Sequence, residues 1–147
     1  MFQEIPEIHV KLVNPNAVMP AKAGPNECGY DVVAAVEPVI QDTYIEYDIG
    51  IQVEPPAGFY FILVPRSSVT KYDLVFAQGV GIIDPTYRGN LKMRFKRIKT
   101  AVGSKIYGVG DKIGQLVLMP YFSAPIVQKE TLTDTARGAG GFGSTGK

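Results

Sequence analysis

One glycine-rich segment, residues 78–89, has residue types that suit recognition of a planar ligand. Its glycines let the backbone approach such a ligand closely, and we expect the segment to form a β-hairpin. Asp84 stands here in an otherwise apolar stretch, where an unpaired carboxylate is costly. Two interpretations stay open for Asp84: a carboxylate that does chemistry, or a turn residue whose oxygens cap the backbone of residues 85–87.

A second group of polar side chains follows the apolar run that ends at Val64. Arg66 offers a guanidinium, and Ser67 and Ser68 offer hydroxyls at the start of a turn, which together suit an anion. The alternative is structural: Arg66 pairs with a surface carboxylate, and Ser67 caps a helical turn.

The last eleven residues, 137–147, contain five glycines and one large apolar side chain, Phe142. Such a segment cannot bury enough surface to fold alone, so one interpretation is a disordered end. The other is an arm that closes over a ligand, because Arg137 matches phosphate and Phe142 can stack on a ring. The segment also looks like a truncated phosphate-binding loop, which we reject because the helix that this motif requires is missing.

Two further residues, Asp31 and Gln115, stand next to glycines and apolar runs. Gln115 is either an ordinary residue at the start of a strand or an amide that contacts a ligand oxygen. The single His, His9, and the single Cys, Cys28, are assigned packing or surface roles. Single copies exclude an internal disulfide and any site that needs two imidazoles.

The composition limits what can position these groups. The chain has 147 residues, 46% of them hydrophobic, which suits one domain with a sizeable core. Its 16 glycines and 11 prolines disfavour a helical bundle, and the formal net charge of +1 gives no case for nucleic acid or a membrane surface. No apolar run reaches a transmembrane length, and no leader is expected. We expect a soluble cytoplasmic protein.

Short segments between the prolines indicate β-strands. Apolar and polar residues alternate over residues 44–53 and 91–96, which predicts strands with one buried face. Continuous apolar runs predict strands covered on both faces at 59–64 and 116–119, and flanking strands are expected at 7–13 and 126–128. One helical turn fits near residues 67–74. An antiparallel sandwich, barrel or jelly roll follows.

The ordered set of segments resembles the five motifs of the trimeric dUTP pyrophosphatases (dUTPases). The motifs are Gly29-Tyr-Asp31, Pro65-Arg-Ser-Ser68, Gly81-Ile-Ile-Asp-Pro-Thr-Tyr-Arg-Gly89, Asp111-Lys-Ile-Gly-Gln-Leu116 and Arg137-Gly-Ala-Gly-Gly-Phe-Gly-Ser-Thr-Gly146. The third and fifth are specific, and the resemblance runs from about residue 8 to the end of the chain.

The resemblance implies an all-β, jelly-roll β-barrel that forms a homotrimer with active sites between subunits. Residues 1–136 would form the jelly-roll domain, and residues 137–147 a flexible arm that closes over a neighbour's site. The implied reaction is hydrolysis of dUTP to dUMP and pyrophosphate with Mg²⁺, which keeps dUTP low and supplies dUMP for thymidylate synthesis. The location would be the cytoplasm, or the host cytoplasm for a viral chain, and a regulatory protein partner stays open.

The resemblance also implies roles for individual residues. Asp84 would orient or deprotonate the attacking water, and Asp31 would reach Mg²⁺ through water. Substrate would be bound by residues in or near the later motifs: Arg66, Ser67, Ser68, Gln78, Gly81, Ile82, Ile83, Tyr87, Lys92, Gln115, Arg137, Phe142, Gly143 and Ser144. Among these, Phe142 would stack on uracil.

The sequence departs from the family at several places, and two alternatives remain. Gly114 replaces the usual Ala, and the connection from residue 66 to 78 is one residue short. A rival is dCTP deaminase, which shares the jelly roll but needs a Glu where this chain has Arg94. The other is a non-enzymatic module that binds a protein partner, against which the joint presence of Asp84, Tyr87 and the arm residues argues.

Overall fold

The computed structural model describes residues 6–144 and 146, and these form an all-β structure with one short 3-10 helix, as predicted. The elements in chain order are β1 (His9–Leu12), β2 (Gly29–Val33), β3 (Val39–Ile40), β4 (Ile45–Asp48), β5 (Ile51–Glu54), β6 (Phe59–Val64), η1 (Ser67–Lys71), β7 (Leu74–Phe76), β8 (Gly81–Ile83), β9 (Lys92–Arg97) and β10 (Lys112–Pro120). In the described part of the chain, no helix has the length and apolarity to span a membrane.

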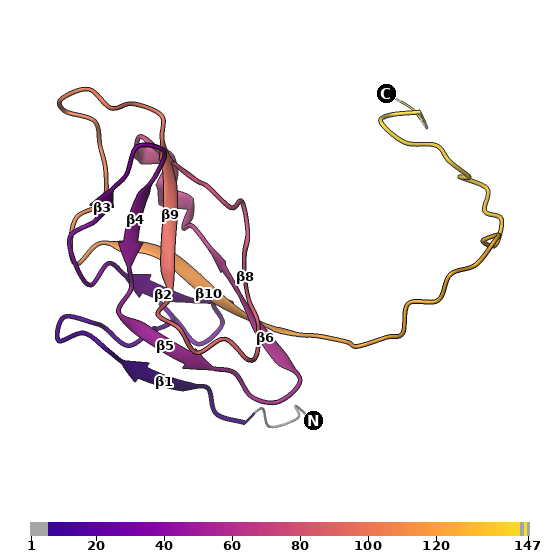
Figure 1. The fold of residues 1–147 in the computed structure, drawn as a ribbon, viewed down its shortest axis with the longest axis horizontal. Coiled ribbons are helices and arrows are strands. Elements are labelled where there is room, and N and C mark those ends of the chain that lie inside the picture. Colours follow the sequence, from indigo (N-terminus) through magenta and orange to yellow (C-terminus); the bar gives the residue numbers. More distant parts are fainter. Residues whose placement is uncertain (1–5, 145, 147) are drawn as a thin grey trace.

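The strands form two four-stranded antiparallel sheets and a separate ribbon (Figure 1). The first sheet has the order β2-β10-β6-β8, the second has the order β3-β4-β9-β7, and β1 pairs with β5. Between the described residues the sheets do not join into one closed barrel. The long strand β10 lies at the centre of the first sheet, where it pairs with both β2 and β6.

The core lies between these layers and follows the predicted alternation. Ile45, Tyr47, Met93 and Phe95 are fully buried, and the residues between them on β4 and β9 face outward. The stretch expected as one strand over 44–53 is divided between two sheets at Gly50, whose φ is +73°. A side chain there would come within 2.9 Å of the Ala35 Cβ, so the break requires glycine.

Three predictions about local structure need correction. Residues 78–89 do not form a hairpin of two paired strands, because β7 pairs with β9 in one sheet and β8 pairs with β6 in the other. Residues 126–128 form no strand, and Ile126 is fully exposed since the described chain offers it no partner strand. On β6, only Phe61 and Leu63 are buried, so the strand is covered completely on one face alone.

The predicted helical turn is confirmed as η1, although Ser67 does not cap it. Arg66 occupies the N-cap position and provides no side-chain hydrogen bond to the turn. Instead, the Thr70 hydroxyl donates to the Ser67 carbonyl at 3.0 Å. The Ser67 hydroxyl therefore has no capping role in this turn.

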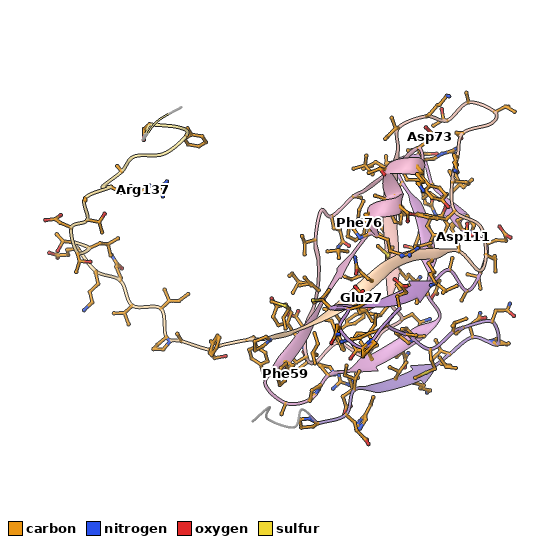
Figure 2. The ribbon with its side chains drawn as sticks, turned by 180° about the vertical axis from the view of Figure 1, so that it is seen from behind. Glu27, Phe59, Asp73, Phe76, Asp111 and Arg137 are labelled. Atoms are coloured by element: carbon orange, nitrogen blue, oxygen red, sulfur yellow. The ribbon has the colours of Figure 1, made fainter. Side chains whose placement is uncertain are left out.

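Beyond β10 the chain leaves the body of the protein as a long extension (Figures 1 and 2). The Tyr121 amide donates to the Gly58 carbonyl at 3.1 Å, and every later backbone hydrogen bond between described residues is local. Residues 121–139 are all exposed. The extension thus includes residues 121–136 as well as the predicted arm.

Candidate active site

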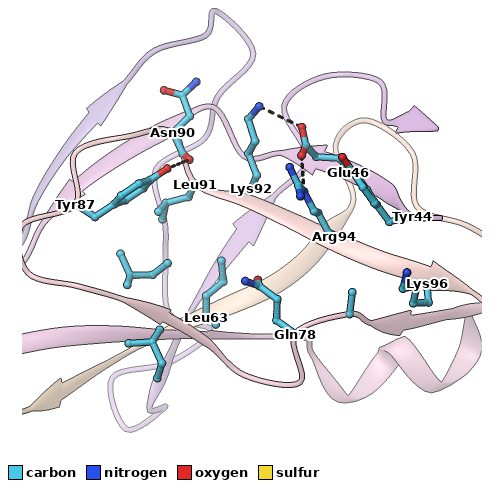
Figure 3. A pocket seen from close by; sticks show the side chains of 14 residues that line it. Tyr44, Glu46, Leu63, Gln78, Tyr87, Asn90, Leu91, Lys92, Arg94 and Lys96 are labelled. Atoms are coloured by element: carbon cyan, nitrogen blue, oxygen red, sulfur yellow. Dashed lines mark hydrogen bonds and ion pairs between the residues drawn. The ribbon is translucent and has the colours of Figure 1, made fainter. Parts of the chain in front are cut away.

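A pocket of about 510 Å³ opens between the two sheets where the chain crosses from β8 to β9 (Figure 3). It brings together six residues that the sequence predicts to contact a ligand: Gln78, Gly81, Ile82, Ile83, Tyr87 and Lys92. Because β8 belongs to the first sheet and β9 to the second, the segment expected to be a hairpin contributes one wall of this pocket and β9 contributes the other.

Both walls present strand edges that have no neighbouring strand among the described residues. β8 is an edge strand of the first sheet. On the other wall, the pairing of β7 with β9 reaches only from Arg97 to Phe95, after which the Ala77 amide donates to the Arg94 carbonyl at 2.9 Å. The backbone of Lys92 therefore lies beyond the reach of β7. Unpaired backbone donors and acceptors on such edges are available to a ligand.

Gly81 sets the close packing of the β8 wall. A Cβ at this position would lie 3.0 Å from the Leu63 carbonyl oxygen and 3.3 Å from the Leu63 Cβ. These two residues are paired in the register of β8 and β6. A larger residue would push β8 away from β6 and into the pocket, which explains the requirement for glycine here.

A tight turn follows β8 and carries Asp84 and Tyr87. The Tyr87 amide donates to the Asp84 carbonyl at 3.0 Å, and the Tyr87 hydroxyl donates to the Asn90 carbonyl at 3.1 Å. The Tyr87 ring lies in the space that a side chain at Gly89 would occupy. Asp84 is exposed, and none of the side-chain hydrogen bonds of the described residues involves its carboxylate. The backbone-capping interpretation of Asp84 is therefore wrong.

A cluster on the pocket wall was missed from the sequence (Figure 3). The Glu46 carboxylate, only 14% exposed, accepts from Lys92 Nζ at 3.1 Å and from Arg94 Nε at 2.7 Å. The Arg94 guanidinium also lies over the Tyr44 ring, 4.4 Å from its centroid. Burial opposes ionisation of Glu46, but the hydrogen bonds from Arg94 and Lys92 outweigh it and lower the pKa of Glu46.

The cluster depends on strand register, since Glu46 on β4 is paired with Arg94 on β9. The alternation of basic residues over 92–96 was visible in the sequence, whereas their partner strand was not. The arrangement leaves the pocket wall with more cations than carboxylates, because Lys96 also lines it. The pocket therefore favours an anionic or oxygen-rich ligand.

A second group of predicted residues lies outside the pocket, on η1, β2 and β10. Asp31 pairs with Arg66, with 3.1 Å between Oδ1 and Nε, and with Lys112, with 3.3 Å between Oδ2 and Nζ. Arg66 therefore forms an ion pair with a carboxylate, which was the structural interpretation of this residue. Gln115 is the strand partner of Asp31. Arg66, Ser67, Ser68 and Gln115 do not line the pocket.

The first motif has a structural connection to the fourth. The Gln115 side chain lies against Gly29, in the space that a Cβ at that position would fill, with its Cδ 2.9 Å from the Cβ position. Gly29 thereby makes room for the Gln115 amide, which neither motif indicates by itself.

The third group lies on the extension, away from the body (Figure 2). Arg137 Nε donates to the Gly140 carbonyl at 2.9 Å, and Phe142 is fully exposed. Phe142 and Gly143 both have positive φ, +51° and +82°, so the segment turns sharply there. Ser144 is exposed, and Thr145 lies outside the described residues.

The donor set for a metal is sparse. Within residues 6–144 and 146, no group of three or more His, Cys, Asp or Glu side chains is close enough to hold an ion. Asp31 is the one predicted carboxylate, and two cations already neutralise it. A hard cation such as Mg²⁺ would therefore need to take most of its ligands from water or from a bound ligand.

Comparison with known proteins gives a consistent family assignment. The family model described as dUTPase matches residues 15–146. A probable deoxyuridine 5'-triphosphate nucleotidohydrolase of Schizosaccharomyces pombe is 35% identical over 141 residues, covering 93% of this chain and 96% of that protein.

Solved structures agree with the sequence comparison. A point mutant of the dUTPase of Staphylococcus bacteriophage 80alpha, solved with dUpNHpp, superposes with a TM-score of 0.82 at 27% identity, covering 96% of this chain and 99% of that one. A mutant dUTPase of Staphylococcus aureus phage phi11, in which a structural Mg(II) ion is coordinated, gives a TM-score of 0.74 at 26% identity, covering 88% and 100%.

Proposed function

The chain belongs to the dUTPase family, and from this membership we propose that it hydrolyses dUTP to dUMP and pyrophosphate. The observation that supports the proposal best is the pocket between β8 and β9, which is bounded by two unpaired strand edges and gathers six predicted substrate residues. Its volume of about 510 Å³ suits a nucleoside.

Backbone groups would select the base. Uracil presents two carbonyl oxygens on either side of one N–H, which strand edges on facing walls can match with alternating donors and acceptors. Cytosine replaces one oxygen with an amine and one donor with an acceptor, so its binding would leave buried polar groups unpaired. Ile82 and Ile83 would supply apolar contact, and the backbone around Gly81 would lie too close to the base to admit thymine's methyl group.

Asp84 and Tyr87 would act at the sugar and the reacting phosphate. The Tyr87 ring, held by its bond to the Asn90 carbonyl, would lie against the deoxyribose and exclude a ribose 2′-hydroxyl. The exposed Asp84 carboxylate would orient and deprotonate the water that attacks the α-phosphorus. The rest of the catalysis would be in-line positioning and neutralisation of charge.

The triphosphate would be held by the residues outside the pocket, namely Arg66, Ser67, Ser68 and Gln115. Arg66 would exchange part of its contact with Asp31 for a phosphate oxygen, a bond strengthened by both charges. Mg²⁺ on the triphosphate would neutralise phosphate charge and be held through water by Asp31.

A homotrimer would unite these three groups. The base pocket and the phosphate residues are separate surfaces of one chain, and the arm leaves its own body (Figure 1). In a trimer, Arg137, Gly143 and Ser144 would close on the phosphates of a neighbouring site while Phe142 stacks on the uracil. The reaction would take place in the cytoplasm, and its product dUMP would feed thymidylate synthesis. A regulatory protein partner is a further prediction.

The test is a nucleotide panel with separated products. The purified chain with Mg²⁺ should convert dUTP to equal amounts of dUMP and pyrophosphate, and should leave dCTP, dTTP and UTP almost unchanged. Deoxyuridine products from dCTP would instead identify the deaminase. Binding of dUTP without turnover would favour the non-enzymatic module.

A further inference from the structure

We propose that Arg88 is a positioning residue that fixes the direction of the Asp84 carboxylate by clamping the turn on which it stands. The inference rests on the proposed function only for the role of Asp84. The clamp itself is a set of contacts within the turn, and it can be tested without substrate.

Nothing in the described residues holds the Asp84 side chain directly. It is exposed, and no hydrogen bond or ion pair among these residues involves its carboxylate. Its direction is therefore set by the backbone of residues 84–87. A base must stand within hydrogen-bond reach of the proton it takes, so the conformation of this turn decides whether Asp84 can act.

Arg88 closes that turn from its far end. Its Nη1 nitrogen donates to the Pro85 carbonyl at 2.6 Å and to the Tyr87 carbonyl at 3.1 Å. One guanidinium nitrogen thus joins the first residue after Asp84 to the last residue of the turn. Because the two N–H bonds of Nη1 have fixed directions in the rigid guanidinium plane, they hold both carbonyls in one relative orientation.

The other side of the guanidinium ties the turn to β5. Arg88 Nη2 lies 3.4 Å from Glu54 Oε2, and at the end of the turn Gln52 Nε2 donates to Asn90 Oδ1 at 3.1 Å. Both Arg88 and Glu54 are about half exposed, so this ion pair contributes little energy by itself. The two carbonyl contacts should matter more, and Arg88→Met should therefore have a larger effect than Glu54→Gln.

Hydrogen exchange measured by NMR tests the clamp directly. The Tyr87 amide, which donates to the Asp84 carbonyl, reports whether the turn stays closed. In Arg88→Met this amide should exchange at least about tenfold faster than in the wild type, with a smaller increase in Glu54→Gln. The matched control Lys99→Met, on an exposed loop, should leave it unchanged. Unchanged exchange in Arg88→Met overturns the proposal, whether or not the chain hydrolyses dUTP.

Turnover then tests whether the clamp acts through Asp84. Arg88→Met should lower kcat for dUTP by roughly 10- to 100-fold, the scale of a small misplacement of a catalytic group. In an Asp84→Asn background the same change should cost less than about twofold, because the group being positioned is gone. Equal losses in both backgrounds, or full activity of Arg88→Met, would overturn the positioning role. A wild type that releases no pyrophosphate would instead refute the proposed function, while the exchange result still judges the clamp.

Discussion

Replacing Gly29 by Ala should damage the phosphate site while leaving the fold nearly intact. A Cβ at position 29 would occupy the place of the Gln115 Oε1 atom and would lie 2.9 Å from the Gln115 Cδ. The two closest atoms are at the far end of a flexible side chain, which can rotate away, whereas the Gln115 Cβ at 3.1 Å requires a shift of a few tenths of an ångström. The amide then no longer lies where the wild type holds it.

The magnitude follows from the contact that Gln115 is proposed to make. A hydrogen bond to a charged group contributes about 1.5–3 kcal/mol, and about 1.4 kcal/mol corresponds to a factor of ten. Gly29→Ala should therefore lower kcat/KM for dUTP by roughly 10- to 100-fold. Rotation of a half-buried amide end and a small shift at the Gln115 Cβ are modest costs, so the free energy of unfolding should fall by only about 1 kcal/mol.

A neighbouring glycine provides the matched control. A Cβ at Gly114 would lie 2.5 Å from the Met93 Sδ and 2.9 Å from the Val64 carbonyl oxygen, which is backbone and cannot rotate away. Gly114→Ala should thus destabilise the protein by about 1–3 kcal/mol through overpacking. Shortening the obstructing side chain in Gly114→Ala/Met93→Val should recover part of this loss.

Urea denaturation and pyrophosphate release measure the two effects separately. If Gln115 is the target of the Gly29 substitution, Gln115→Ala should match its kinetic loss, and the double variant should lose no more than either single variant. Full activity of Gly29→Ala, or losses that multiply in the double variant, would refute the reasoning.

Three further predictions concern the pocket wall, the core and the arm. The pKa of Glu46 is lowered in the folded chain, so its stabilisation is present above the unfolded pKa and is lost as the pH falls through the folded pKa. The difference in unfolding free energy between wild type and Glu46→Gln should therefore shrink from pH 6 to pH 3. A difference that does not depend on pH would contradict the pairing of Glu46 with Lys92 and Arg94. Tyr47→Phe removes a 2.9 Å hydrogen bond to the Tyr107 carbonyl and should lower the free energy of unfolding by about 1 kcal/mol in urea denaturation. Tyr107→Phe removes a buried hydroxyl that has no partner among the described residues and should leave this free energy unchanged. A larger loss in Tyr107→Phe than in Tyr47→Phe would contradict this assignment. Burial raises the pKa of both tyrosines to about 12, so the unfolded chain loses these protons first and the free energy of unfolding should fall as the pH rises from about 10 to 12. Deleting residues 137–147 should leave the body folded, by circular dichroism, with strongly reduced turnover of dUTP, and normal turnover would rule out a closing arm.

The sequence was sufficient where local pattern decides structure. Met93 and Phe95 alternate with basic residues in the sequence, and this period of two correctly predicts that their side chains are buried. The turn at Ser67–Lys71 likewise follows from local residue types. The glycines at 79 and 81 predict close backbone approach, which is a local property, and Gly81 lies in the pocket wall.

Local sequence patterns could not predict which distant strands pair with each other. Residues 78–89 look like a hairpin, yet their single strand, β8, pairs with β6, whereas the next strand, β9, lies in the other sheet, and the pocket opens between the two. Glu46 was missed because nothing in its neighbourhood along the chain shows that Arg94 is its strand partner. Residues 126–128 have the pattern of a strand but lack a partner within the described chain.

The most direct measurement is the rate of pyrophosphate release from dUTP by the wild type and by Asp84→Asn, with Mg²⁺ present. The two side chains have nearly the same shape, but the amide cannot accept the proton of the attacking water. Because general-base catalysis contributes about 10²- to 10⁴-fold, Asp84→Asn should be at least about 100-fold slower while it still binds dUTP. Comparable rates in the two proteins would contradict the account.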